Sequence, residues 1–197
     1  NTIANYIVES IFTISGGTGG GAIEGQSITE TTHLITSINP EQGMIISGSS
    51  LESKETFIKE IQINVKEETE NVKIKVSSYD EKPNEISVGK DGVVYKYLKI
   101  DVENLNSNLD KAKITLQLEK SKIEEKNLPK ENIALFKLDE QNNKWNELPT
   151  NYTNEDGKYY YYETELSSFS FFAISEKTVV EQIISEITES YERASQN

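Results

Sequence analysis

The stretch WNELPTNYTNEDGKYYYYETELSSFSFFAI, residues 145–174, decides the fold. Trp145 and Leu148 end one expected strand, and residues 154–157 supply a turn whose Asp-Gly pair suits the positive φ angles of a tight hairpin. Four consecutive tyrosines, residues 159–162, then lead to a phenylalanine-rich end. Aromatic runs bounded by turn residues are typical of a half-buried sheet surface, so this stretch predicts strands that close a β-domain.

Upstream of this stretch, apolar residues alternate with lysines and other polar residues, which is typical of antiparallel strands with one wet face. Residues 57–65 and 72–76 predict a hairpin, and residues 79–92 predict a long polar loop. Short apolar segments at 33–35 and 44–46 predict edge strands. Further alternation occupies residues 94–102, 112–118 and 133–136. The sequence therefore predicts an all-β, antiparallel, Ig-like β-sandwich of about eight or nine strands.

Two helices are expected in addition. Ser121 and Glu124 fit the capping box S-x-x-E, which predicts one short helix that ends before Pro129. A C-terminal amphipathic helix is indicated by apolar residues that repeat at three and four positions: Val180, Ile183, Ile184, Ile187 and Tyr191. This apolar stripe docks either on its own domain or on another subunit.

The first fifteen residues, NTIANYIVESIFTIS, are apolar on both alternating faces. Their spacing also fits a helix, but the β-branched residues favour a strand. As a strand arm that contacts another subunit, its candidate residues are Ile3, Tyr6, Ile7, Val8, Ile11, Phe12 and Ile14.

A glycine-rich run, residues 16–21, follows this strand directly. Gly17, Gly19 and Ala22 match a dinucleotide-binding spacing, but no periodic helix follows, so a flexible tether is favoured and no cofactor is expected. A strand on a tether must satisfy its backbone groups by pairing. It either returns to its own sheet or is donated to the sheet of the next subunit, and the sequence leaves both open.

Composition narrows the classes of partner. The 197 residues carry a formal charge of −13, which repels nucleic acid and anionic membranes. No apolar run approaches the ~20 residues that cross a bilayer, so no membrane insertion is expected of this chain. The chain has no cysteine, so thiolate chemistry and disulfides are excluded.

No motif for catalysis or metal binding is present. His33 is the only histidine, and one imidazole without cysteine does not make a zinc site, so a structural role is favoured. Carboxylate pairs occur at residues 80–81, 124–125, 139–140 and 155–156, in expected turns or on a polar helix face, where solvated charge is the favoured interpretation. With no G-x-S-x-G or H-E-x-x-H, we expect no catalytic residues, no metal site and no enzyme. A carboxylate-dependent hydrolase is the remote alternative.

The order of several segments between about residues 40 and 174 resembles the PGF-pre-PGF domain of archaeal, largely methanogen, surface proteins. The matching segments are Tyr95-Lys96-Tyr97, KSKIEE at 120–125, Leu135-Phe136, WNELPT at 145–150, Asp156-Gly157 and LSSFSFFAI at 166–174. Lys122 stands where that family usually has Trp, and Ser167-Ser168 replace its Pro-Gly. The resemblance implies an extracellular, non-catalytic, β-rich surface module.

Asn151 begins the sequon Asn-Tyr-Thr in an expected exposed connection, and is a candidate N-glycosylation site.

We therefore expect three parts: a strand arm and tether at 1–21, a β-sandwich at 22–174 and a helix at 175–197. The leading hypothesis is a structural glycoprotein subunit of an archaeal extracellular, pilus-like filament or cell-surface layer. It forms homo-oligomers or polymers through donation of its N-terminal strand. The alternative is a glycan-binding, adhesin-like surface module that presents Tyr159 to Tyr162, of which alternate rings face opposite sides of a strand.

Overall fold

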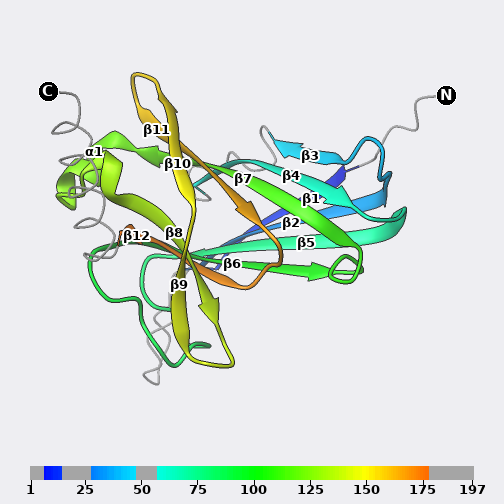
Figure 1. Ribbon diagram of the computed structural model, residues 1–197, viewed down its shortest axis with the longest axis horizontal. Coiled ribbons are helices and arrows are strands. Elements are labelled where there is room, and N and C mark those ends of the chain that lie inside the picture. Colours follow the sequence, from blue (N-terminus) through cyan, green and yellow to red (C-terminus); the bar gives the residue numbers. More distant parts are fainter. Residues whose placement is uncertain (1–6, 15–27, 48–56, 178–197) are drawn as a thin grey trace, which may run out of the picture.

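The computed structural model describes residues 28–47 and 57–177 in full, and the backbone of residues 7–14. Twelve strands and one short α-helix lie in this part of the chain (Figure 1). The first six strands are β1 (Ile7–Ile14), β2 (Ile28–Ile38), β3 (Met44–Ser47), β4 (Ile58–Val65), β5 (Thr69–Tyr79) and β6 (Val94–Glu103). The rest are β7 (Leu109–Glu119), α1 (Lys120–Glu125), β8 (Ile133–Asp139), β9 (Lys144–Leu148), β10 (Thr150–Glu155), β11 (Tyr159–Leu166) and β12 (Phe171–Glu176).

The strands form two antiparallel sheets, which confirms the all-β sandwich. One sheet has seven strands in the order β1-β2-β5-β6-β12-β8-β9, and the other has five in the order β10-β11-β7-β4-β3. More strands are present than the sequence indicates, in part because Thr150–Glu155 is a strand and not the expected connection. Its polar side chains lack the alternation that marks a half-buried strand.

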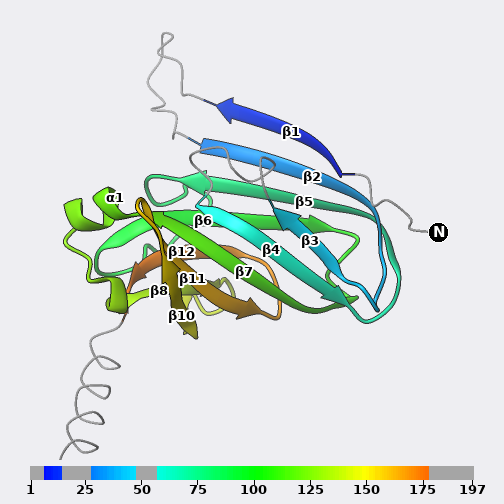
Figure 2. The same ribbon diagram turned by 90° about the horizontal axis from the view of Figure 1, so that it is seen from above.

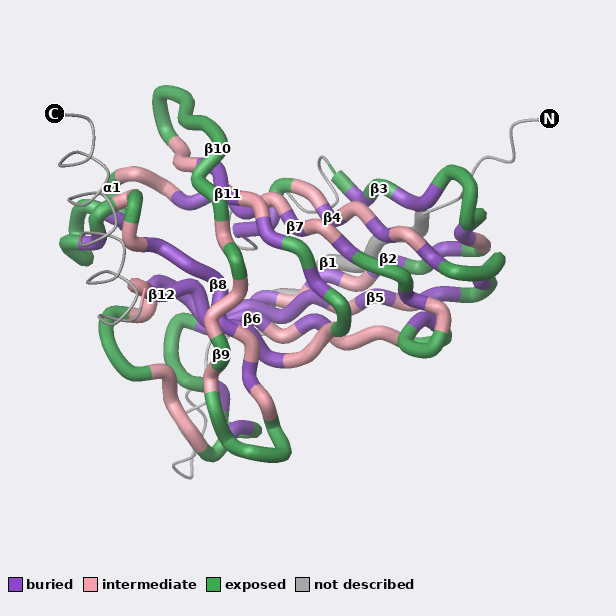
Figure 3. The backbone as a smooth tube through the Cα atoms, in the orientation of Figure 1, coloured by how far each residue is buried: buried purple, intermediate pink, exposed green. Residues whose placement is uncertain are grey.

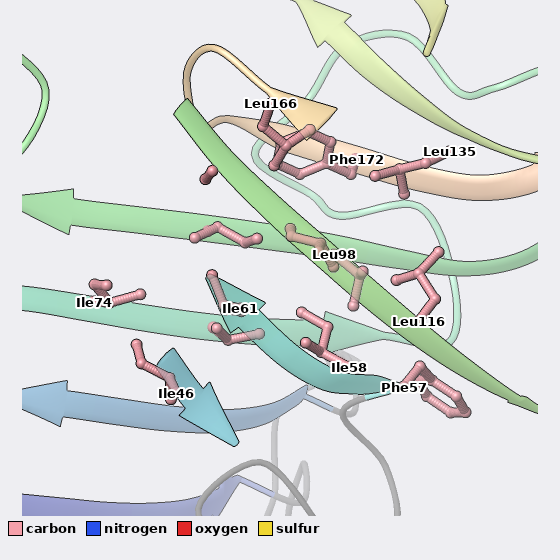
Figure 4. Packing of buried hydrophobic residues seen from close by; sticks show 14 of the residues in the cluster. Ile46, Phe57, Ile58, Ile61, Ile74, Leu98, Leu116, Leu135, Leu166 and Phe172 are labelled. Carbon is pink, nitrogen blue, oxygen red and sulfur yellow. The ribbon is translucent and has the colours of Figure 1, made fainter. Parts of the chain in front are cut away.

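The main core lies between the sheets. Ile46, Ile58, Ile61, Leu116 and Leu166 of the five-stranded sheet face Ile74, Leu98, Leu135 and Phe172 of the seven-stranded sheet (Figure 4). Figure 3 shows the same division along the chain, with buried positions on the strands and exposed ones concentrated at turns. Each fully buried aliphatic side chain contributes about 1.5–3 kcal/mol, so this layer is the main source of stability.

The expected hairpin between residues 57–65 and 72–76 is wrong. β4 pairs with β3 and β7 in one sheet, whereas β5 pairs with β2 and β6 in the other. The connections β4–β5 and β6–β7 both cross between the sheets at the same end, where Lys66 N–H donates to Asn108 O at 2.8 Å. Alternation identifies the buried face of a strand but not its partner, so two strands facing one core from opposite sheets look like a hairpin.

The capping box at α1 is also wrong, although the short helix is confirmed. The helix begins at Lys120 with Glu119 as its N-cap, and no side chain caps it. Ser121 therefore lies inside the first turn. The helix is fixed instead by its one buried residue, Ile123, which packs in the core.

The loop after β5 adds a partial third layer on the outer face of the seven-stranded sheet. Residues 80–93 form no helix or strand, as the sequence predicts, yet Ile86 is only 5% exposed. Ile86 and the half-buried Val88 belong to a second apolar cluster with Tyr97, Phe136 and other residues of this sheet. Trp145 of β9 closes this layer, because its Nε1–H donates to Val88 O at 3.3 Å.

Candidate functional site

β1 is an edge strand of the seven-stranded sheet and pairs with β2 of the same chain. Figure 2 shows it as the outermost strand of that sheet, beyond β2. The register runs without a shift from Ile7 opposite Ile35 to Ile14 opposite Ile28. The two strand ends thus lie side by side, yet residues 15–27, thirteen residues, connect them.

Five of the seven predicted arm residues lie in β1, and Ile3 and Tyr6 lie outside the described residues. Opposite the five in the register are Ile35 for Ile7, Leu34 for Val8, Thr31 for Ile11, Glu30 for Phe12 and Ile28 for Ile14. The predicted helix contacts Val180, Ile183, Ile184, Ile187 and Tyr191 lie outside the described residues, as does the glycine run.

β2 pairs with β1, and most of the buried side chains along β2 are polar. Thr29, Thr31, His33 and Ile35 alternate along this strand and are all buried. His33 lies opposite Glu9 of β1 and Ile74 of β5, and its complete burial in the sheet fits the structural role expected of it. The edge-strand prediction for residues 33–35 is wrong while β1 is docked, because β2 then lies between β1 and β5.

The four sheet edges differ in how they resist pairing with another chain. β3 has four residues in the described part of the chain, and β9 begins at the exposed Lys144 and is followed by Pro149. β10 is interrupted by a register shift at Thr153. Shortness, lysine, proline and bulges are the devices by which proteins block edge-to-edge pairing. β1 has none of them, with eight residues, the sequence IVESIFTI and a regular register.

The tyrosine run is not an exposed platform. In β11, Tyr161 and Tyr162 are buried, and Tyr159 and Tyr160 are half-buried. The more exposed ring belongs to Tyr152 of β10, which is 39% exposed and whose centroid lies 6.2 Å from that of Tyr160. The alternative of a glycan-binding tyrosine strip on β11 loses its geometric basis, since none of its four rings is fully available.

The β10–β11 turn is held by a carboxylate and not by a left-handed glycine. Asp156 accepts the backbone N–H groups of Lys158 and Tyr159, each at 2.7 Å, while Gly157 keeps a φ outside the left-handed region. The Tyr161 hydroxyl donates to Asp156 Oδ2 at 2.5 Å. This bond, helped by the two backbone donors, lowers the pKa of Asp156 to about 2. The expected turn is confirmed, but the strand before it is β10 and not the strand that ends at Leu148, and its Asp-Gly pair lacks the expected positive φ angles.

Asn151 is exposed in β10, so its amide is accessible at the edge of the five-stranded sheet. It lies opposite Glu163 of β11. Thr153, the third residue of the sequon, donates its hydroxyl to Tyr161 O at 3.3 Å. The sequon therefore lies on an edge strand and not in a connection.

An open groove of about 660 Å³ crosses the outer face of the seven-stranded sheet. Its cations are already paired: Lys73 Nζ lies 2.8 Å from Glu103 Oε1, and Lys99 Nζ lies 2.6 Å from Glu85 Oε2. Lys75 Nζ contacts Glu30 Oε1 at 3.1 Å. Burial alone would raise the pKa of Glu30, but hydrogen bonds from Ser77 and Lys75 outweigh it and lower the pKa. The groove is a neutralised sheet surface without a convergent unpaired group.

No metal site is formed in the part of the chain that the structure describes, where no three His, Asp or Glu side chains gather closely enough to hold an ion. Members of three of the four carboxylate pairs have other partners. Asp80 bonds to Lys96, Asp139 accepts the backbone N–H of Asn142 at 3.1 Å, and Glu155 lies 3.2 Å from Lys130 Nζ. Within residues 7–14, 28–47 and 57–177, no helix is long and apolar enough to span a membrane.

No protein-family model, curated protein or solved structure matches the chain. The resemblance to the PGF-pre-PGF domain therefore stays a prediction. The β1 edge is the feature that the geometry distinguishes from the other sheet edges. The sequence predicted this strand through the arm residues that lie in β1. The edge strand expected at residues 33–35 was not recognised as the partner of β1, and its full length was missed, although the alternation of Thr29, Thr31, His33 and Ile35 marks it.

Proposed function

We propose that this chain is a structural subunit of an archaeal extracellular filament or surface layer, which assembles when β1 leaves its own β2 and pairs with β2 of a neighbouring subunit. The observation that carries the proposal is the connection between the two strands. Antiparallel neighbours whose ends lie side by side are usually joined by two to five residues. Here the connection is thirteen residues long and contains the glycine run 16–21.

The length of this connection suits an exchange between subunits. Thirteen residues span at most about 45 Å when extended, and a flexible glycine-rich chain of this length has a mean end-to-end distance of roughly 20 Å. A compact domain of about 150 residues is roughly 40 Å across. The tether therefore reaches the β2 edge of a subunit packed alongside.

The energetics of exchange favour assembly only when subunits are concentrated. The pairs from Ile7–Ile35 to Ile14–Ile28 are the same whether β1 is docked within a chain or between chains, so exchange changes few contacts. The tether gives β1 an effective concentration of about 1 mM at the β2 edge of its own chain, so dilute subunits stay closed. A crowded cell surface, or a growing filament end, supplies the concentration that opens them.

The same proposal places the protein outside the cell and expects a glycan on Asn151. An exposed sequon on edge strand β10 supports it, because a glycan there is tolerated and shields a second sheet edge. Intact mass of the protein from its native source, before and after removal of N-glycans, tests this directly. An unmodified mass in the native protein contradicts it.

Strand donation can be tested with engineered disulfides, because the chain has no cysteine of its own. Ser10 lies opposite Thr32 in the register, and cross-strand partners have Cα separations within the range that disulfides need. One population carries Ser10→Cys and a size tag, and a second carries Thr32→Cys. After refolding together at high concentration and oxidation, the expected product is the tagged–untagged disulfide dimer, which no closed chain can form.

Two controls define the outcome. Thr36→Cys replaces Thr32→Cys in the off-register control, since Thr36 has no partner in β1, and it should give little mixed dimer. The double variant Ser10→Cys/Thr32→Cys on one chain should close within the chain when dilute, which checks the register. Strand donation is wrong if the double variant closes but the mixed pair never crosslinks.

A further inference from the structure

The outer edge of β1 is an open hydrogen-bonding surface that neither docking within a chain nor strand donation uses. One edge of β1 pairs with β2, and among the described residues no strand pairs with the other. Alternate residues of this eight-residue strand present backbone N–H and C=O groups along this edge, in a regular, unbulged register. Such an edge is a template for a further strand.

We infer that this outer edge pairs antiparallel with the outer edge of β1 from a second copy, which joins two seven-stranded sheets into one continuous sheet. The inference does not depend on strand exchange. If β1 is docked in its own chain, the contact makes a dimer. If β1 is donated, the same contact joins neighbouring filaments side by side.

The four sheet edges differ in whether they carry features that block pairing with another chain. β3, β9 and β10 carry a short length, a flanking proline with an exposed Lys144, and a register shift, respectively. These are protective features at three of the four edges. Their absence from β1 marks the edge at which pairing with another chain is tolerated.

The partner strand is β1 of a second copy of this chain, in an antiparallel arrangement. A two-fold contact between identical edges places residue i opposite j and j opposite i, so one strand supplies both halves. β1 contains a single charge, Glu9. Parallel in-register pairing places Glu9 opposite Glu9, whereas antiparallel two-fold pairing centred on Ser10 or on Ile11 places it opposite Ile11 or Thr13. Like charges directly opposite are destabilising, which favours the antiparallel contact.

Single-cysteine variants along β1 test this contact. The positions are Ile7, Glu9, Ser10, Ile11, Phe12 and Ile14, each replaced by Cys in the full chain. One or two neighbouring central positions should form disulfide homodimers at least about ten-fold faster than Ile7→Cys and Ile14→Cys. The reason is that antiparallel pairing holds each end roughly 24 Å from its own copy, beyond the reach of a disulfide.

A pair of proline variants separates the two edges of β1. Neighbouring residues of a strand direct their N–H groups to opposite edges, so one of Ser10→Pro and Ile11→Pro removes a donor to β2 and the other a donor to the outer edge. In chains that also carry Val8→Cys and Leu34→Cys, a register pair, closure of the internal disulfide reports β1 docking. One proline variant should keep this disulfide and lose dimerisation.

Equal crosslinking at all six positions would indicate a parallel stack or random collision and would overturn the inference. A chain that stays monomeric by sedimentation at high concentration, with both proline variants unchanged, would also overturn it. Strand donation is judged separately, by the tagged mixed dimer between positions 10 and 32. The two proposals can thus fail independently.

Discussion

Gly43 and Gly157 both lie in turns, but only one of the two has a backbone conformation that requires glycine. Gly43, between β2 and β3, has φ +64°, and a Cβ built on it lies 2.7 Å from the carbonyl oxygen of Ile63. Gly157, in the conspicuous Asp-Gly pair, keeps a φ outside the left-handed region, and a Cβ there meets nothing within 4 Å. The glycine that the backbone needs is therefore Gly43.

Gly43→Ala should lower the free energy of unfolding by about 2 kcal/mol or more, because it combines left-handed strain with a clash against backbone. Gly157→Ala should be neutral or stabilising by up to about 1 kcal/mol, because alanine restricts the unfolded chain. Urea denaturation of the two variants beside the parent measures both. Equal destabilisation by the two substitutions would contradict the assigned backbone conformations.

Asp156 makes the β10–β11 turn sensitive to acid. Its pKa falls to about 2 from an ordinary value of 3.8, because the Tyr161 hydroxyl and two backbone N–H groups bond to the carboxylate. A lowered pKa in the folded state means that the ionised group stabilises the fold. This contribution is complete above about pH 4 and is lost as the pH falls toward 2.

The Asp156→Asn variant should therefore lose stability relative to the parent near neutral pH, and the difference should shrink between pH 4 and 2. Asparagine keeps an oxygen for the backbone donors but carries no charge that titrates. Unfolding free energies of both proteins across this range provide the measurement. A difference that is constant with pH would show that the charge of Asp156 contributes nothing to the turn.

Among the elements, the loop of residues 80–93 packs against the outer face of the seven-stranded sheet and covers it. Ile86 and Val88 cover the outer face of the seven-stranded sheet, and Lys90 Nζ lies 4.2 Å from the centroid of the Phe136 ring. Burial among these groups lowers the pKa of Lys90. Trp145, the only tryptophan, is bonded to the loop at Val88, so its fluorescence reports on this layer.

Ile86→Ala should destabilise the protein by about 2 kcal/mol, near the lower limit for a buried isoleucine, because a loop collapses more readily than a strand. Trp145 emission should shift to longer wavelength at lower denaturant than in the parent. Val93→Ala is the matched control in the same loop, since Val93 is 39% exposed and should change stability by less than about 0.5 kcal/mol. Similar effects of both variants would mean that this layer is not a packed core.

For the whole molecule, the net charge of −13 opposes any contact between identical subunits. The contacts proposed for β1 use backbone groups and apolar residues, so assembly should strengthen with salt. Raising NaCl from about 0.01 to 0.15 M shortens the screening length from about 30 to 8 Å. We expect the apparent association constant to rise roughly ten-fold, measured by sedimentation or light scattering at fixed protein concentration.

CaCl₂ at matched ionic strength is the control for this measurement. A similar response indicates screening, whereas assembly at far lower CaCl₂ would indicate bound cations at the contact. Assembly that dissolves as salt is added would mean that ion pairs hold the subunits, which contradicts the proposed contact.

The class of fold and the positions of most strands are predictable from the amino-acid sequence alone. For example, the alternation of Val72, Ile74 and Val76 indicates which face of β5 is buried, because successive side chains along a strand point to opposite faces. The sequence also indicated the turn before β11, the short helix and an N-terminal strand that needs a partner. All of these are local properties, because each depends on a few consecutive residues.

Which strands are neighbours is not predictable in this way and follows from the three-dimensional packing of the chain. β4 and β5 follow each other but lie in different sheets, β1 returns to β2 across a long tether, and Phe57 adopts φ 56° at the start of β4. The Phe57 ring is held by Tyr95, whose centroid lies 5.2 Å away and which comes from a distant strand. These features depend on backbone pairing and packing between residues that are far apart in the chain. A periodic pattern indicates that one face of a strand is buried, but it does not indicate which residues cover that face.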